Sequence, residues 1–266
     1  MRNSSSGARL MIGLAMAVFA LISYFGSSTF NEVTGEKQHI SLTPDQEISL
    51  GLQAKPEMVQ EFGGEHPDAR LRTLVENVGR RVLQQSDANK TGWQFEFTLL
   101  ADPQTINAFA LPGGQVFITY ALLSRLQTEG QLAGVLGHEI GHVVARHGAQ
   151  HMAKEDLTGG LLGAVSVASG SASADQIAAQ VAQMINLKYG RGDELQSDDL
   201  GVRFMTQAGY DPRAMVGVME ILQAAAGPNR VPEFQSTHPD PGNRIQKIQE
   251  AIQKYYPNGL PTGLKP

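Results

Sequence analysis

The chain of 266 residues contains no cysteine. Disulfide bonds, cysteine-ligated zinc, a thiol nucleophile and a lipid-modified cysteine are therefore excluded, so any metal chemistry must use histidine and carboxylate side chains. Positive charge is not in excess either: the net charge is -5 and the isoelectric point is near 5.8, which argues against nucleic acid as a main partner. With 41% hydrophobic and 18% charged residues, the composition is that of a globular domain.

Charge is missing altogether from one N-terminal stretch. No charged residue occurs between Arg9 and Glu32, and residues 10–25 are almost wholly apolar. As a helix, these roughly 22 uncharged positions would span about 33 Å, which is enough to cross a bilayer.

A cleaved signal peptide is the alternative for residues 1–31. The bulky Tyr24 and Phe25 end the apolar segment, and no good small-x-small cleavage site follows it, so a retained membrane anchor is favoured. Arg2 and Arg9 would keep the N-terminus in the cytoplasm. Under either interpretation the rest of the chain is exported.

The remainder divides into a connector, one domain and a short tail. Residues 32–43 are polar, and residues 43–46 carry the capping pattern of a helix start. We expect Pro56 to break or kink this first helix, and a pair of glycines to end it. The domain is predicted to cover residues 44–256, followed by a Pro/Gly-rich tail at 257–266.

A small sheet is expected near the start of this domain. A helix beginning at about Asp68 precedes it, with an apolar face formed by Leu71, Leu74, Val75, Val78 and Val82. Residues 93–100 then alternate apolar and polar side chains as a half-buried strand does. A Pro-Gly-Gly turn at residues 112–114 separates a short extended segment from a further strand at 116–119. The fold class is therefore α+β and mainly helical.

Helical patterns dominate the rest. A capping box at residues 128–131 predicts one long helix through residue 155. Residues 158–175, rich in Gly, Ala and Ser, could be a mobile flap, a closely packed helix pair or a membrane-touching surface, but we favour a loosely packed connector. Further helices are expected at residues 176–187, 191–208 and 244–255.

The long helix contains the pattern His138-Glu139-x-x-His142. On a helix the two histidines lie about 40° apart in projection and about 6 Å apart along the axis, so both imidazoles can reach one ion. In this HExxH arrangement the histidines bind zinc and Glu139 is a general base. The pattern alone arises by chance in roughly one chain in a hundred of this size, so a third ligand must decide between metal binding and simple packing.

Two further histidines follow on the same predicted helix. A third ligand in the metzincin pattern would require glycine at position 145 and histidine at 148, where the chain has Ala145 and Gly148. His147 and His151 form a second i, i+4 pair but lie roughly 180° and 220° round from His138. We expect both to face solvent rather than to bind a second metal.

A better third ligand lies in residues 191–201. Glu194 and Asp198 are four residues apart on a predicted helix, so both carboxylates share one face. Glu194 could complete an open three-ligand catalytic site, with Asp198 accepting the spare N–H of a ligating imidazole. Asp193 and Asp199 are rival carboxylates that spacing alone does not exclude.

Taken together, these segments resemble a known family. The HEIGHVVARH run, the E-x-x-x-D of Glu194 and Asp198, residues 107–114 and the Thr-His-Pro turn at 237–239 are similar to the zinc metallopeptidases of family forty-eight, which include bacterial HtpX and the eukaryotic CAAX prenyl proteases. The resemblance covers residues 31–250 in order, and is greatest to exported bacterial envelope members. Two features depart from the family: Ser197 replaces its usual Ala, and there is one hydrophobic segment instead of several.

The resemblance implies a zincin-like (gluzincin) fold with a small sheet whose edge strand lines the active-site cleft. One Zn²⁺ per chain would be held by His138, His142 and Glu194. Glu139 would be the general base, and Asp198 a hydrogen-bond partner of a ligand or a proton donor. These roles would let the enzyme hydrolyse peptide bonds.

The resemblance also implies substrate-binding residues. Asn107 and Ala108 would belong to the edge strand that pairs with an extended substrate, although an internal hairpin strand is the alternative. His238 would donate to the developing oxyanion or, as in some relatives, close the metal's open position, unless it is a loop histidine without a role. Arg244 would hold that loop or the substrate backbone, or simply open a helix.

We therefore expect an exported, membrane-associated zinc endopeptidase that acts in cell-envelope protein quality control. Its location would be the bacterial periplasm, anchored to the inner membrane, and its partners would be unfolded or misassembled envelope proteins and no nucleic acid. The alternative is a chaperone-like assembly factor that uses the same cleft with rare, gated proteolysis. A metal-free structural module is the weakest interpretation.

Overall fold

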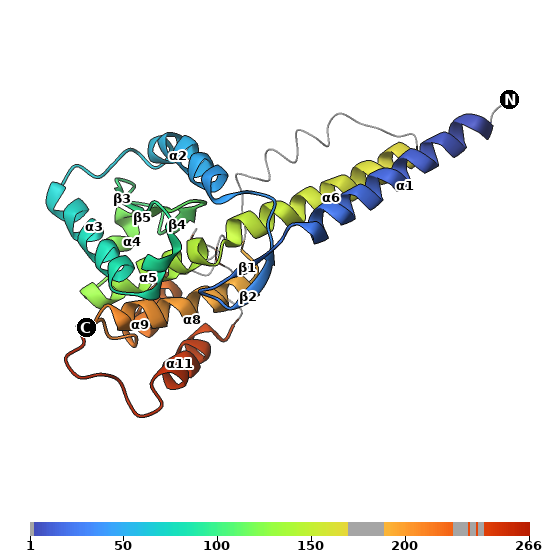
Figure 1. Ribbon diagram of the computed structural model, residues 1–266. Coiled ribbons are helices and arrows are strands. Elements are labelled where there is room, and N and C mark those ends of the chain that lie inside the picture. Colours follow the sequence, from blue (N-terminus) through green and yellow to red (C-terminus); the bar gives the residue numbers. More distant parts are fainter. Residues whose placement is uncertain (1–2, 170–188, 226–233, 235–237, 239–241) are drawn as a thin grey trace. The chain divides into compact units, whose positions relative to one another are not determined.

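The computed structural model describes residues 3–169, 189–225, 234, 238 and 242–266 (Figure 1). The predicted helix at 176–187 lies outside these residues. The chain forms two compact units, one made of Met1–Thr43 with Gly148–Leu187 and the other of Pro44–His147 with Lys188–Pro266.

The smaller unit contains a pair of helices and a short hairpin. α1 (Asn3–Gly26) is followed by β1 (Ser28–Asn31) and β2 (Glu36–His39), which pair antiparallel. α6 (His147–Ser169) lies beside α1 (Figure 1), and the small residues of the two helices meet: a Cβ on Gly160 would come within 2.8 Å of the Cβ of Ala20. Within the described part of the chain, only α1 is long and apolar enough to cross a membrane, over Ser6–Gly26.

This arrangement corrects one expectation. Over residues 158–169 the Gly/Ala/Ser-rich segment is helix rather than a loose connector. Its small side chains allow close packing against α1, so the closely packed helix pair is the interpretation that holds. Residues 170–175 lie outside the described residues.

The larger unit begins with two helices. α2 (Pro44–Glu61) continues through Pro56, so the expected break does not occur. Pro56 is exposed. Proline has no backbone N–H, so one carbonyl in the preceding turn of the helix lacks its usual hydrogen bond, but this carbonyl can bond to water instead. α3 (Ala69–Gln84) is capped by Asp68, whose Oδ1 accepts from the backbone N–H of Arg70 at 2.8 Å.

Four of the five predicted face positions of α3 turn inward, but one does not. Val75, Val78 and Val82 are buried and Leu71 is half-buried, whereas Leu74 remains 39% exposed, so its assignment to the packed face was wrong. The short 3-10 helix η1 (Asp87–Thr91) then leads into the sheet.

The predicted small sheet has three strands in the order β3-β5-β4. β3 (Glu96–Leu100) is parallel to β5 (Gln115–Thr119), and β5 forms an antiparallel hairpin with β4 (Ala108–Leu111). The Pro-Gly-Gly turn works as expected, since Gly113 adopts φ +83° and a Cβ there would fall 2.4 Å from the Cα of Ile48. Among the described residues β4 pairs only with β5, which makes it an edge strand.

α5 (Glu129–Val144) runs through the centre of this unit, and residues 130–144 are all buried. Such a helix needs neighbours on every side. α8, α3, α9 and the sheet pack around it. The side chain of Thr128 caps it by accepting from the N–H of Gln131 at 3.2 Å, while Gln131 returns a bond to the N–H of Gln127 rather than to Thr128.

The single long helix predicted through residue 155 is interrupted. α5 ends at Val144, Arg146 takes the left-handed φ of 55°, and α6 begins at His147. A non-glycine residue in this region costs about 1–2 kcal/mol. Arg146 offsets that cost because its Nε donates to Glu47 at 2.8 Å and its guanidinium lies 5.5 Å from the Trp93 ring centroid.

The helices predicted at 191–208 and 244–255 are present as α8 (Arg191–Gln207) and α11 (Arg244–Tyr255). The described residues of this unit also form α4 (Tyr120–Leu123) and α9 (Ala214–Ala225). The C-terminal tail returns to the domain: the N–H of Lys265 donates to Gly209 and the carbonyl of Pro266 accepts from Gly130.

We expect Gly79→Ala in α3 to destabilise the larger unit. A Cβ at this position would lie 2.5 Å from the ring of Phe97, and such overpacking costs about 1–3 kcal/mol. Thermal unfolding of the detergent-solubilised chain measures the loss. Gly192→Ala in α8 is the matched control because nothing lies within 4 Å of its Cβ position. Equal unfolding temperatures for the two variants would contradict this packing.

Candidate metal centre

The contact between α5 and α8 places the candidate ligands opposite one another. It is a close backbone approach, because a Cβ on Gly141 would lie 3.1 Å from the carbonyl oxygen of Ser197 and one on Gly137 3.4 Å from that of Gly201. Ser197 is itself fully buried, so its small side chain suits the place where the resembling family has alanine. The two helices therefore bring the HExxH residues against Glu194.

Four side chains converge at this contact. One ligand atom from each of His138, His142, Glu194 and His238 lies within 4.8 Å of the others, and all four residues are buried. The Nε2 atoms of His138 and His142 are 3.0 Å apart. Each of these atoms is 3.4 Å from one carboxylate oxygen of Glu194. The third ligand predicted from the sequence thus lies beside the two histidines.

His238 approaches from a different part of the chain. Its Nδ1 is 3.1 Å from Oε1 of Glu194 and 3.3 Å from Nε2 of His138. The ring of Phe234 stacks on it, with centroids 4.4 Å apart, and the N–H of His238 donates to the carbonyl of Phe234. Its neighbours at 235–237 and 239–241 lie outside the described residues.

Glu139 is fully buried beside this cluster. Neither carboxylate oxygen has a hydrogen-bond partner within the part of the chain that the structure describes, and Oε1 lies 3.7 Å from Nε2 of His238. Burial raises the pKa of Glu139. A carboxyl group held in this way is prepared to take up a proton.

Asp198 and Arg244 support the opposite side of His138. Nδ1 of His138 lies 2.9 Å from Oδ1 of Asp198, and Arg244 donates to both carboxylate oxygens of Asp198, from Nη2 at 2.6 Å and from Nε at 2.8 Å. Burial opposes ionisation of Asp198, but Arg244 and His138 outweigh it and lower its pKa. Burial also opposes the charge on His138, yet its bonds to Asp198 and Glu194 raise its pKa to about 9.

Arg244 has a second contact in the cluster. Its Nη1 lies 3.3 Å from Oε2 of Glu194, and the pKa of Glu194 is lowered despite burial because His238, His138 and His142 favour the carboxylate. Arg244 therefore contacts the carboxylates of both Asp198 and Glu194. Its contact with substrate stays a prediction.

The rival carboxylates lie elsewhere. Asp193 accepts from the N–H of Gly190 at 2.9 Å at the start of α8. Asp199 binds Nζ of Lys254 at 3.0 Å on the other side of the helix. Sequence spacing alone could not show which of these carboxylates is the ligand, but the hydrogen-bond partners of Asp193 and Asp199 lie away from the two histidines.

Comparison with known proteins identifies the family that shares these features. The model of peptidase family M48 matches residues 65–252. This chain belongs to that family. The match includes all the cluster residues above and most of the larger unit.

Curated relatives of this M48 chain come from mitochondria and bacteria. It is 32% identical over 230 residues to the mitochondrial metalloendopeptidase OMA1 of Schizosaccharomyces pombe, covering 85% of this chain and 67% of that protein. It is 29% identical over 225 residues to the beta-barrel assembly-enhancing protease of Escherichia coli, covering 79% and 46%. For human OMA1 the identity is 27%, covering 92% and 50%. The chain thus spans about half the length of the last two relatives.

The donor set of the M48 cluster fits a metal cation. In the neutral tautomers in which Nδ1 of His138 donates to Asp198 and Nδ1 of His142 donates to His147, at 2.9 Å in each case, both Nε2 atoms carry lone pairs, and a bound cation would take the place of the proton that the raised pKa gives His138. These lone pairs and the Glu194 carboxylate then face one another without an intervening proton. Two imidazoles and one carboxylate are a ligand set typical of catalytic zinc. Burial lowers the pKa of His142 well below its usual value, which favours the neutral, ligating form.

His147 is not a solvent-facing residue, and that expectation was wrong. It is buried, its Nδ1 lies 2.9 Å from Nδ1 of His142, and its Nε2 lies 2.8 Å from Oε1 of Gln196. The helical angle failed because the chain leaves helical geometry at Arg146, so a count of 100° per residue does not carry across. His151, on the smaller unit, is half-exposed.

Two aromatic residues of the site were missed from the sequence. Tyr189 stacks on the His142 ring with centroids 3.8 Å apart, and Phe234 stacks on His238. The four-residue interval between Phe234 and His238 was a usable signal, since residues at this spacing are often neighbours. No local pattern marks Tyr189.

Asn107 and Ala108 lie at the start of the edge strand β4. Ala108 lies in β4 opposite Ile118, and Asn107 precedes it with its carbonyl accepting from the N–H of Thr119 at 3.0 Å. The buried Oδ1 of Asn107 has no hydrogen-bond partner among the described residues. Contact of either residue with a substrate stays a prediction.

We expect His147→Ala to weaken metal binding by about 10–100-fold, the usual cost of removing a hydrogen-bond partner of a ligating histidine. The substitution takes away the acceptor for Nδ1–H of His142. Competition for zinc with a colorimetric chelator measures the affinity. His151→Ala is the control on the same helix and should match the wild type, whereas unchanged affinity in His147→Ala would contradict the assigned role.

Proposed function

We propose that this M48 chain is an exported, membrane-associated zinc endopeptidase acting in cell-envelope protein quality control. The observation that carries the proposal is the buried carboxylate of Glu139, which has no hydrogen-bond partner among the residues that the structure describes and lies beside the three acceptor groups of His138, His142 and Glu194. A closed structural site would not need such a group. A hydrolase does, because a proton must leave the attacking water and reach the leaving amine.

Zinc held by His138, His142 and Glu194 would lower the pKa of a water molecule and polarise the scissile carbonyl. Glu139 would take the proton from the water whose oxygen attacks the carbonyl carbon, and would deliver it to the amine nitrogen as the C–N bond breaks. Its raised pKa suits both transfers. Asp198 is held in place by Arg244 and accepts from Nδ1–H of His138. This favours the tautomer with its proton on Nδ1, which leaves Nε2 free to act as a ligand toward the cluster.

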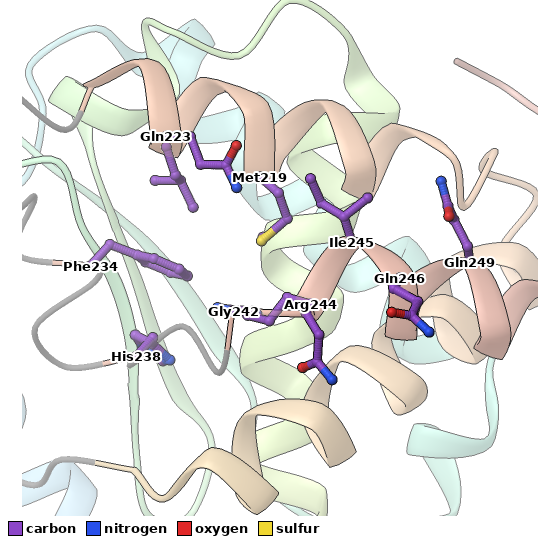
Figure 2. A pocket seen from close by; sticks show the side chains of 11 residues that line it. Met219, Gln223, Phe234, His238, Gly242, Arg244, Ile245, Gln246 and Gln249 are labelled. Atoms are coloured by element: carbon purple, nitrogen blue, oxygen red, sulfur yellow. The ribbon is translucent and has the colours of Figure 1, made fainter.

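The edge strand β4 suggests how a peptide is positioned. An extended substrate adds naturally to an unpaired strand edge, where main-chain hydrogen bonds need no particular sequence. A cavity of about 320 Å³ adjoins the cluster, and His238, Phe234 and Arg244 lie on its wall together with residues of α9 and α11 (Figure 2). We propose this cavity as a subsite for a substrate side chain.

Location and substrates are proposed from α1 and the relatives. α1 has the length and composition of a membrane-crossing helix. The bacterial relative is named for β-barrel assembly and the eukaryotic ones for mitochondria. A periplasmic domain on an inner-membrane anchor, acting on unfolded or misassembled envelope proteins, is consistent with both.

Glu139→Gln should abolish peptide hydrolysis while one zinc per chain remains bound. The amide keeps the shape of the side chain but cannot accept the proton, and loss of a general base costs about 10²–10⁴-fold in rate. Casein cleavage by the full-length chain, with metal content measured on the same sample, provides the test. Retained cleavage in this variant would disprove the proposed mechanism.

A second candidate function is a chaperone-like assembly factor whose proteolysis is rare and gated. The position of His238 favours it, because Nδ1 of His238 lies among the ligand atoms where a water or a substrate carbonyl would otherwise bind. The binding of a client would have to withdraw His238 before hydrolysis. The cleft would otherwise hold proteins without cutting them.

His238→Ala separates gating from catalysis. If His238 closes the site, the variant cleaves casein faster than the wild type, and a tenfold rise corresponds to a closed state favoured by about 1.4 kcal/mol. If His238 instead stabilises the oxyanion, kcat falls. Asn243→Ala, on the wall of the same cavity, controls for a general disturbance of the pocket. A fall in kcat confined to His238→Ala would overturn the gating proposal.

A further inference from the structure

The contact between α1 and α6 is made by small residues on both helices. A Cβ on Gly13 would lie 2.6 Å from the carbonyl oxygen of Ala164, and one on Gly163 3.6 Å from Cε of Met16. Together with the approach of Gly160 to Ala20, these contacts show that the helices run antiparallel. Backbones brought together by Gly and Ala are typical of helix pairs inside membranes.

The outer surfaces of this helix pair are apolar. On α6, Leu162 is 54% exposed and Val165 66% exposed. On α1, Phe19 is 72% exposed, and further exposed large apolar residues are Leu10, Met11, Ile12, Leu14, Ile22 and Phe25. So many exposed apolar side chains are unfavourable in water and favourable in lipid.

The distribution of charge along α6 also suits a membrane environment for its C-terminal part. Lys154, Glu155 and Asp156 occupy its middle, and residues 157–169 carry no charge. This uncharged part is about 20 Å long as a helix, which is shorter than the roughly 30 Å hydrocarbon core of a bilayer. α6 therefore cannot cross a membrane by these residues alone, but it can enter one.

We propose that the C-terminal half of α6 is inserted into the lipid bilayer beside α1, so that the protein holds the membrane with two helices rather than one. The proposal rests on the retention of α1 put forward above and adds a second membrane element to it. Ala20, beside Gly160, lies about 9 Å along the helix from the end of α1, and Gly13 about 20 Å. Leu162 and Val165 would accordingly face acyl chains.

The absence of cysteine allows a direct test, because each single-cysteine variant carries a fluorophore at one known site. We would label Val165→Cys with an environment-sensitive nitrobenzoxadiazole dye. The full-length protein would be placed in phosphatidylethanolamine and phosphatidylglycerol vesicles containing lipids with a nitroxide on the acyl chain. Phe19→Cys on α1 is the positive control, and Lys154→Cys, exposed on α6, is the negative control.

The inference predicts blue-shifted emission and quenching at positions 165 and 19, and neither at position 154. Quenching at 19 without quenching at 165 would overturn the inference and leave the α1 anchor intact. Loss of quenching at both would overturn the membrane anchor as well. None of these outcomes depends on proteolysis, so a failure here is distinct from a failure of the catalytic proposal.

A disulfide test checks the helix pair independently. Ala20→Cys combined with Gly160→Cys should cross-link on mild oxidation in membranes, because the two Cβ positions are 2.8 Å apart and a small shift reaches the usual separation of about 3.8 Å. Ile22→Cys with Gly160→Cys is the matched control, since Ile22 is 66% exposed on α1. Equal cross-linking of both pairs, or none in the first, would contradict the packing of α6 on α1.

Discussion

The close approach of α5 and α8 is the constraint on which the site depends. Gly137 and Gly141 let the α5 backbone lie against Ser197 and Gly201 of α8, and this brings the carboxylates of Glu194 and Asp198 to opposite sides of the His138 ring. Larger residues at these glycines would separate the helices and move the carboxylates out of reach of the imidazoles. The burial of α5 on every side keeps that geometry rigid.

Several ionisable groups are buried together in this contact, and their arrangement explains how the fold tolerates them. Isolated buried charges are costly, whereas paired and hydrogen-bonded ones are not prohibitive. Arg244 pairs with Asp198 and Glu194, and His147 links His142 to Gln196. Glu139 has no hydrogen-bond partner for either carboxylate oxygen among the described residues, which is a cost to stability at the position where proton transfer is proposed.

The sequence predicted the positions of the site residues correctly where these positions depend only on the spacing within one helix. The i, i+4 intervals of His138 with His142 and of Glu194 with Asp198 predicted shared faces, and the resemblance to the zinc peptidases joined the two helices. The prediction for His147 failed because the helix is interrupted before it. Arg146 has a left-handed backbone conformation, and this changes the direction of the chain so that the His147 side chain contacts His142 in the site. The inward position of Arg244 depends on the packing of α11 against α8, and no spacing within its own helix reveals that contact.

The central claim is that Glu194 of α8 completes a metal site with the two histidines of α5. Zinc content per purified chain, measured by inductively coupled plasma mass spectrometry for wild type, Glu194→Ala and Asp199→Ala, tests it most directly. The account predicts one zinc per chain in the wild type and in Asp199→Ala, whose carboxylate binds Lys254 instead, and loss of zinc in Glu194→Ala. Undiminished zinc in Glu194→Ala, or none in the wild type, would contradict the account.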